Sequence, residues 1–329
     1  MTTNNIKTIL FASLMVAMIL PFSVMGIADA APNENADDKA KEVVDSLSIP
    51  NAERDLKLAD GQKLFPGQGW VKADVHSKAP APIFRDNPNN PGEQILDIDT
   101  MIKKSEESKI TETSGDIVQD FLNALSIPLA EAADGYNQIV HKDSSSNDFT
   151  YHRAYWDVPA APSSYSGGTN FSFPAVQPAT GSNIIFQPVL QHGWSSVCDS
   201  GNDFDTYALI LVAGSAYHTP CTDADPGERI RGTLSESNNV WTVAVRNYGN
   251  SAANDSYSVY YSGQMDFGAL AVETYDLGSS CSKLQGDVEF DTVTNTGDVD
   301  SWVTAGSGQF CGMTETIVSD SNVEFFNNN

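Results

Sequence analysis

From Phe149 to the end of the chain, short β-rich runs alternate with turn residues, and this pattern most constrains the fold. The runs predicted to be strands are Tyr151–Val158, Asn183–Gly193, Thr206–Val212, Arg229–Ser235, Val240–Asn247, Ser256–Tyr261, Leu270–Leu277, Asp287–Val293 and Glu315–Val318. Many short strands without helical periodicity predict an all-β fold, an antiparallel β-sandwich or jelly roll. Because proline cannot donate to a ladder, Pro188 predicts a bulge or an edge position for its strand.

The chain before this region divides into two further parts, so we predict the domains 1–30, 31–145 and 146–329. Lys7, the apolar run Thr8–Ile27 and the ending Ala28-Asp29-Ala30 are typical of a secretory signal peptide; a retained membrane anchor is the alternative. No later segment reaches the roughly 18 apolar residues of a spanning helix. We therefore expect a secreted or cell-surface, extracellular protein with no stable membrane insertion after signal cleavage.

Residues 31–145 contain no cysteine and show an uneven pattern. Helical spacing of apolar residues predicts short helices over Asp37–Leu47 and Ser114–Ala133, whereas residues 79–93 resemble a linker. This region carries most of the lysines and precedes an acidic domain. The arrangement suits a propeptide or an intramolecular inhibitory segment held by opposite charge; a flexible spacer is the alternative.

All four cysteines lie in the C-terminal half, and none forms a CxxC pair. An even number of cysteines in an exported protein, without metal-ligand spacing, predicts two disulfides. Three pairings are open, and the simplest joins sequence neighbours. The cysteines concerned are Cys198, Cys221, Cys281 and Cys311.

The formal net charge is -25, from 18 basic and 43 acidic residues. Such a charge repels nucleic acid and favours cationic partners or metal ions at long range. Adaptation to solubility in salty or acidic surroundings is the alternative. Acidic groups such as Asp199, Asp203 and Asp205 do not fit EF-hand spacing, so we interpret them as solvated loop acids rather than calcium ligands. We expect no metal and no cofactor.

The sequence lacks HExxH, GxSxG, P-loop and GxGxxG patterns, which leaves carboxylate, amide and hydroxyl chemistry. Strand periodicity places Gln187 and Gln191 on one face of their predicted strand. The same rule places Glu273 and Tyr275 on one face of another strand, beside small alanines that leave room for a ligand.

Three motifs occur in a fixed order: Trp156-Asp157-Val158-Pro159, then Leu190-Gln191-His192-Gly193, then Val272-Glu273. In this order they resemble the glutamic peptidases (eqolisins) and their secreted relatives, over about residues 151–295. The segments Tyr217-His218-Thr219 and Gly69-Trp70-Val71 resemble a less-studied branch of secreted proteins with the same domain. The resemblance implies a concanavalin-like β-sandwich with a catalytic glutamine and glutamate on neighbouring strands.

Mapped by these motifs, the catalytic pair is Gln191 and Glu273, and the implied activity is that of a secreted endopeptidase with a polypeptide substrate. Glu273 would take a proton from water, and the Gln191 amide would stabilise the oxyanion. Burial and nearby Tyr275 are expected to raise the carboxyl pKa. The expected substrate-binding residues are Gln187, Phe173, Tyr275 and His218.

The alternative function is a non-catalytic sandwich that binds carbohydrate or another surface ligand, because lectins often use this architecture. Exposed aromatic side chains would then stack on sugar rings. The candidates are Trp156, Trp194, Trp241 and Trp302.

Overall fold

The computed structural model describes residues 63–64, 71–73, 82–109, 135–143, 149–164, 167–178, 184–195, 197–212, 215–249, 254–275, 280–296, 301–304 and 310–328. The predicted signal peptide and the predicted helices at 37–47 and 114–133 lie outside the described residues, so they stay predictions. No helix in the described ranges is both long and apolar enough to span a bilayer.

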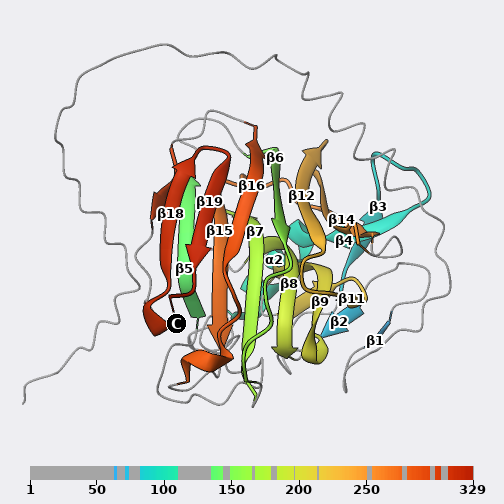
Figure 1. Ribbon diagram of the computed structural model, residues 1–329. Helices are drawn as coiled ribbons and strands as arrows, with labels where there is room; N and C mark the ends of the chain where they lie inside the picture. Colours follow the sequence, from blue (N-terminus) through green and yellow to red (C-terminus); the bar gives the residue numbers. More distant parts are fainter. Residues whose placement is uncertain are drawn as a thin grey trace, which may run out of the picture.

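Two large β-sheets make up the described fold (Figure 1). The first sheet has the order β1 (Lys63–Leu64), β2 (Val71–Ala73), β10 (Ser215–His218), β9 (Asp199–Val212), β8 (Ile184–Trp194), β7 (Thr169–Gln177), β15 (Phe267–Tyr275), β5 (Gly135–Asp143) and β17 (Val303–Thr304), with β11 (Thr222–Ala224) also paired to β9. The second has the order β18 (Thr314–Ser319), β19 (Asn322–Phe326), β16 (Val288–Asn295), β6 (Tyr151–Asp157), β12 (Arg229–Ser237), β13 (Val240–Asn247), β14 (Asn254–Tyr260), β4 (Gln94–Asp97) and β3 (Phe84–Asp86). In Figure 1, β18 and β3 lie at opposite sides of the molecule.

The predicted all-β sandwich is confirmed, and each of the nine predicted runs overlaps a strand. Neighbouring strands in both sheets are antiparallel except β14 and β4, which are parallel. The β12–β13 hairpin turns at Asn238 and Asn239, which have φ of 54° and 62°. Asparagine tolerates this left-handed backbone better than most residues, which explains the tight two-residue turn.

The core lies between the sheets, where alternate strand residues meet. Phe186 of β8 packs with Leu234 of β12, and Leu190 of β8 packs with Trp156 of β6. The residues between them on β8, such as Val189, belong to a third cluster on the outer face of the first sheet. Period-2 alternation of the strand thus assigns Gln187 and Gln191 to that outer face.

The sheets approach closely at Gly232 of β12. A Cβ atom there would lie 2.6 Å from Pro188 and 2.9 Å from Pro174, both in the first sheet, and 3.0 Å from Trp156. These separations are shorter than van der Waals contact. Gly232 therefore permits the spacing of the two sheets at this point.

Segments before residue 146 take part in both sheets. β2 pairs with β10, and β5 pairs with β15 and β17 in the first sheet. In the second sheet, β3 and β4 form the end beyond β14. The linker interpretation of residues 79–93 is therefore wrong for 84–86, which form β3. Phe84 is the apolar residue of this strand, and pairing with β4 outweighs the effect of the nearby prolines.

An unpredicted helix, α2 (Ile98–Lys109), follows β4. Asp97 caps it, because its Oδ1 accepts a hydrogen bond of 3.0 Å from the Thr100 N–H. Ile98 and Met101 of this helix are fully buried in the core cluster that contains Phe186. The helix thus closes one part of the core.

The predicted edge position for Pro188 is wrong. β8 lies between β7 and β9, and Pro188 pairs in register with Ala208 of β9. On the β7 side, paired positions stop at Ser172 opposite Leu190 and resume beyond Pro174. Pro174 and Pro188 both lie in this unpaired stretch. Because proline has no N–H group, placing both here means that few hydrogen bonds between the strands are lost. β7 itself was not predicted, because Pro174 and Pro178 obscured its strand pattern.

Both disulfides join sequence neighbours, which confirms the simplest pairing. Cys198 and Cys221 have their Cα atoms 6.1 Å apart, and Cys281 and Cys311 have theirs 5.2 Å apart. The first disulfide ties the segment after β8 to the segment before β11. It therefore lies beside the predicted site.

Candidate functional site

Gln191 and Glu273 lie in one row across the outer face of the first sheet. Gln191 of β8 pairs with Phe171 of β7, and Phe171 pairs with Glu273 of β15. Directly paired residues of antiparallel strands point to the same face. Strand β7 therefore separates the strands of the two candidate groups, so the expectation that they lie on neighbouring strands is wrong. Their Cα atoms are about 10 Å apart from the strand spacing. The Phe171 side chain lies between them on the same row.

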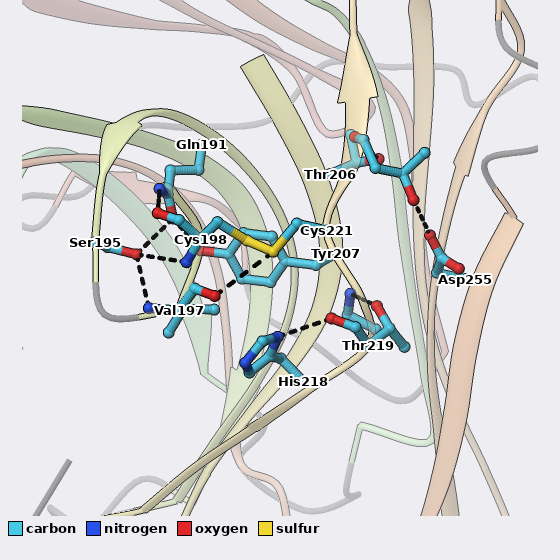
Figure 2. Close-up of a disulfide and its surroundings, with 12 residues drawn as sticks. Gln191, Ser195, Val197, Cys198, Thr206, Tyr207, His218, Thr219, Cys221 and Asp255 are labelled. Carbon is cyan, nitrogen blue, oxygen red and sulfur yellow. Dashed lines mark hydrogen bonds between the residues drawn. A yellow bond between two sulfur atoms is a disulfide. The ribbon is translucent and has the colours of Figure 1, made fainter. Parts of the chain in front are cut away.

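Gln191 is fully buried, and its amide is held by the protein (Figure 2). Its Nε2 donates to the carbonyl oxygens of Gly193, at 2.7 Å, and Cys198, at 2.9 Å. Its Oε1 accepts from Ser195 Oγ, at 2.9 Å, and from the Tyr207 hydroxyl, at 2.7 Å. Both N–H groups of the amide are thus engaged with main-chain oxygens.

The segment after β8 is organised around this amide. Ser195 Oγ accepts hydrogen bonds from the N–H groups of Val197 and Cys198, both at 3.1 Å, while it donates to Gln191. The Cys198–Cys221 disulfide fastens the same segment to β11 through a short connection. Gln191 therefore has a fixed position, which any role in binding would require.

Glu273 is partly buried and partly exposed on this face. Burial raises the pKa of Glu273 to about 8, and a hydrogen bond from Tyr275 opposes this rise. The expectation that Tyr275 would help to raise the pKa is wrong, because a phenol that donates a hydrogen bond stabilises the carboxylate. Below about pH 8 the folded protein holds Glu273 in its neutral form.

Tyr207 connects the two candidate groups electrostatically. It is fully buried, and its pKa lies well above the usual value because of burial and the negative charges of Asp205 and Glu273. The hydroxyl therefore remains a donor toward Gln191 over the accessible pH range. Tyr207 was not predicted as a site residue, although alternation along the predicted strand Thr206–Val212 could have assigned its side chain to one face.

Asp205 does not lie in a loop. It belongs to β9, pairs directly with Gln191 and has a relative exposure of 6%. The interpretation of this residue as a solvated loop acid is therefore wrong, because β9 begins at Asp199 rather than at Thr206. The row across the sheet consequently runs from Asp205 through Gln191 and Phe171 to Glu273.

The predicted substrate-binding residues are spread over this outer face. Tyr275 is near Glu273, and its ring packs against Phe171 with centroids 5.8 Å apart. Phe173 is buried and pairs with Ala271, one same-face position along from the row. Gln187 lies four residues from Gln191 along β8, a separation of about 13 Å.

His218 lies four strands from Glu273 in the sheet order, or roughly 19 Å away. Its Nδ1 donates to the Thr219 carbonyl at 2.7 Å, and its ring lies edge-on to Tyr207 with centroids 5.9 Å apart. Burial lowers the pKa of His218 to about 4, so the ring is neutral near pH 7. The structure does not bring this histidine to the Glu273 carboxyl.

The aromatic residues that would support sugar stacking are mostly in the interior. Trp156, Trp241 and Trp302 have relative exposures of 0%, 2% and 5%, whereas Trp194 is 42% exposed. Trp156 and Trp241 pack in the core because their strand positions point between the sheets, and Trp302, which directly precedes β17, packs in the same cluster as Trp156. The expectation that all four are exposed is therefore wrong.

In the described ranges, no group of three or more His, Cys, Asp or Glu side chains lies where it could hold a metal ion. The chemistry available at the row is a carboxyl group with a raised pKa, a fixed amide and a phenol. Together they define a sandwich protein with a candidate proton-transfer group on one outer face.

Comparisons with known proteins found similarities among solved structures alone. No family model matches the chain, and no curated protein matches it. Among solved structures, it is similar to scytalido-glutamic peptidase with a transition state analog inhibitor, at 15% identity, with 60% of this chain and 98% of that chain covered and a TM-score of 0.44. It is also similar to SCP-B, a member of the eqolisin family in complex with the tripeptide Ala-Ile-His, at 14% identity, 59% and 98% coverage and a TM-score of 0.41.

A further similar structure is tailspike protein 2 from Escherichia coli O157:H7 bacteriophage CAB120, at 13% identity, with 48% of this chain and 20% of that chain covered and a TM-score of 0.22. TM-scores below 0.5 at such identities do not assign the chain to any of these families. The proposed function therefore rests on the geometry of the residues in the row.

Proposed function

We propose that this protein is a secreted endopeptidase of the glutamic type that hydrolyses polypeptides with Glu273 and Gln191. The observation that carries the proposal is the shared row of these two residues on one sheet face, together with the Glu273 pKa of about 8. Perturbed carboxyl groups cluster at catalytic sites because proton transfer needs a pKa near the working pH.

In the proposed reaction, ionised Glu273 takes a proton from a water molecule, and the resulting hydroxide attacks the peptide carbonyl carbon. The carbonyl oxygen becomes an oxyanion, which accepts a hydrogen bond from the Gln191 amide. The protonated Glu273 then gives its proton to the leaving amine as the C–N bond breaks, which restores the carboxylate.

The Gln191 amide imposes a condition on this reaction. Its two N–H groups donate to Gly193 and Cys198, so a substrate oxygen has to replace one of these carbonyls. Tyr207 keeps its bond to the amide oxygen and so maintains the orientation of the side chain.

Access to the row imposes a second condition. Phe173, Val189 and Ala271 on the same face have relative exposures of 1% or less. We infer that an N-terminal segment is displaced or removed before substrate binds. Removal of all of 31–145 would strip β15 of its partner β5 and would also remove β3, β4 and the buried Ile98 and Met101 of α2, so we place any cleavage before Phe84.

The test is digestion of an unfolded protein substrate by the full chain and by Glu273→Gln between pH 4 and pH 9, with new amino termini as the readout. Each protein is assayed before and after limited trypsin treatment, which would release a cover before Phe84. We expect cleavage that rises with pH toward 8 in the original chain and is lost in the variant. Equal cleavage by both proteins rejects the assignment, and Glu289→Gln, an exposed change elsewhere, is the matched control.

A further inference from the structure

The outer face of the second sheet carries a concentration of positive charge. After Lys142 the chain has only five basic residues, and four of them lie on this face. Those four are Arg153, Arg229, Arg231 and Arg246. In a chain of net charge -25, this grouping runs against the general distribution of charge.

We call Arg153, Arg231, Arg246, Tyr155 and Tyr248 the arginine–tyrosine patch. Tyr155, Arg231 and Arg246 pair directly across β6, β12 and β13, so their side chains lie in one row. Arg153 is the next residue on the same face of β6. Tyr248 directly follows β13.

The two tyrosine rings support the guanidinium groups. Tyr155 and Tyr248 stack with centroids 6.2 Å apart and an interplanar angle of 24°. Arg153 lies 5.4 Å from the Tyr155 centroid, and Arg246 and Arg231 lie 4.6 Å and 5.9 Å from the Tyr248 centroid. Stacked guanidinium groups keep their N–H edges available for carboxylate oxygens.

The three patch arginines lack acidic partners in the part of the chain that the structure describes. Arg229 provides the contrast, since it pairs with Asp157 at 3.0 Å and with Asp291. Arg231 of β12 and Arg246 of β13 lie directly opposite each other on adjacent strands. Like charges in such positions destabilise a sheet.

The patch arginines lower the pKa of Tyr155, and the patch side chains are open to solvent. Burial alone would raise the pKa of Tyr155, but the charges and hydrogen bonds of Arg153, Arg231 and Tyr248 outweigh it and lower that pKa. Tyr248 is 44% exposed, and the three arginines are partly exposed. The positive potential therefore reaches solvent.

We propose that the arginine–tyrosine patch binds an extended acidic polypeptide segment through carboxylates at alternate positions. Same-face residues of an extended peptide are about 7 Å apart, from a rise of about 3.3 Å per residue. Arginines on neighbouring strands are about 5 Å apart when directly opposite and about 7–8 Å apart on the diagonal. Alternate carboxylates therefore match the diagonal spacing of Arg231 and Arg153, and Arg246 lies about 5 Å from Arg231 on the neighbouring strand.

Charge complementarity favours a short acidic peptide over a long polyanion as the ligand of the patch. The remainder of the protein is strongly acidic and repels long polyanions such as nucleic acid. A short peptide with few carboxylates escapes most of that repulsion while it gains bidentate contacts to guanidinium groups. This inference does not depend on the proposed peptidase activity, because the patch lies on the other sheet.

The experiment measures fluorescence anisotropy of a labelled peptide with Asp at alternate positions, titrated with the full chain at low and at physiological salt. Glu273→Gln serves as the protein background, so that proteolysis cannot destroy the probe. An otherwise identical peptide with Asn in place of Asp and a carboxylated polysaccharide, polygalacturonate, are the comparison ligands. The variants are Arg231→Gln with Arg246→Gln, and Arg231→Lys with Arg246→Lys.

We expect the acidic peptide to bind, the Asn peptide not to bind, and the double Gln variant to weaken binding by about tenfold or more. The double Lys variant, which keeps the charge, should fall between the two. The matched control is Arg85→Gln, because Arg85 stacks on Tyr260 of the same sheet at 3.5 Å but has Asp97 nearby. Its binding should change less than about twofold.

Three results would overturn the proposal: no binding of the acidic peptide at low salt, equal binding by the double Gln variant, or binding of polygalacturonate in preference to the peptide. Circular dichroism of each variant separates a lost site from a lost fold. If the double Gln variant is unfolded, the double Lys variant decides, and unchanged binding by it rejects the bidentate contacts.

Discussion

Replacement of Glu273 by Gln should change how the stability of this protein depends on pH. Glu273 has a pKa of about 8 in the folded protein, compared with 4.5 for an ordinary glutamate. Between these two values the folded state holds a proton that the unfolded state releases. Unfolding therefore becomes more favourable as pH rises through this window, and the effect disappears when the carboxyl group is replaced by an amide.

The magnitude follows from the size of the pKa shift. Each pH unit well inside the window changes the free energy of unfolding by about 1.4 kcal/mol. Between pH 5 and pH 7, the original protein should lose roughly 2.5 kcal/mol relative to Glu273→Gln. Below about pH 4 the difference between the two proteins should no longer change with pH, because both states are protonated.

Urea unfolding at pH 5, 6, 7 and 8, followed by tryptophan fluorescence, measures this difference. Glu289→Gln provides the control, because Glu289 is exposed on β16 and its replacement should leave a constant offset. A gap between Glu273→Gln and the original chain that stays the same from pH 5 to pH 7 would refute the reasoning. Such a result would mean that water reaches the Glu273 carboxyl.

Three further changes test other parts of the structure. Gly232→Ala should lower the free energy of unfolding by about 1–3 kcal/mol, because a Cβ atom would press on the prolines of the facing sheet. Tyr207→Phe should cost about 1–2 kcal/mol, since the buried amide oxygen of Gln191 loses one donor. Joint replacement of Cys198 and Cys221 by Ser should cost about 3 kcal/mol, because the disulfide closes a segment with a sequence separation of 23.

Denaturant unfolding measures all three changes, and Ser237→Ala, at the exposed end of β12, serves as a neutral reference. An unchanged midpoint for Gly232→Ala would show that the sheets can separate without cost. For Tyr207→Phe, original stability would mean that water replaces the phenol. The disulfide argument fails if the Ser variant unfolds at the same urea concentration as the original chain.

Much of the fold was predictable from local patterns. The nine predicted runs are strands because alternation of apolar and polar residues, with turn residues between the runs, acts over a few neighbouring positions. β7 and α2 escaped prediction for local reasons as well. Pro174 lies in the first, and the helix follows a strand directly, with only Asp97 as its capping signal.

The candidate site was predictable in part. Periodicity gave the face on which Gln191 and Glu273 each lie along their own strands, but it did not give the strand between them or the engagement of the Gln191 amide by Gly193 and Cys198. Tyr207 also escaped notice, since its link to the amide depends on the pairing of β8 with β9.

The sequence by itself determined which residues alternate along each strand, where the turns fall and which cysteines were available for disulfides. These properties depend on the backbone geometry of a few consecutive residues. Only the tertiary structure decided which strands are neighbours, and therefore that three tryptophans are buried, that Asp205 faces Gln191 and that the arginines gather on one face. Register between distant strands is set by the packing of whole sheets, and no short stretch of sequence contains that information.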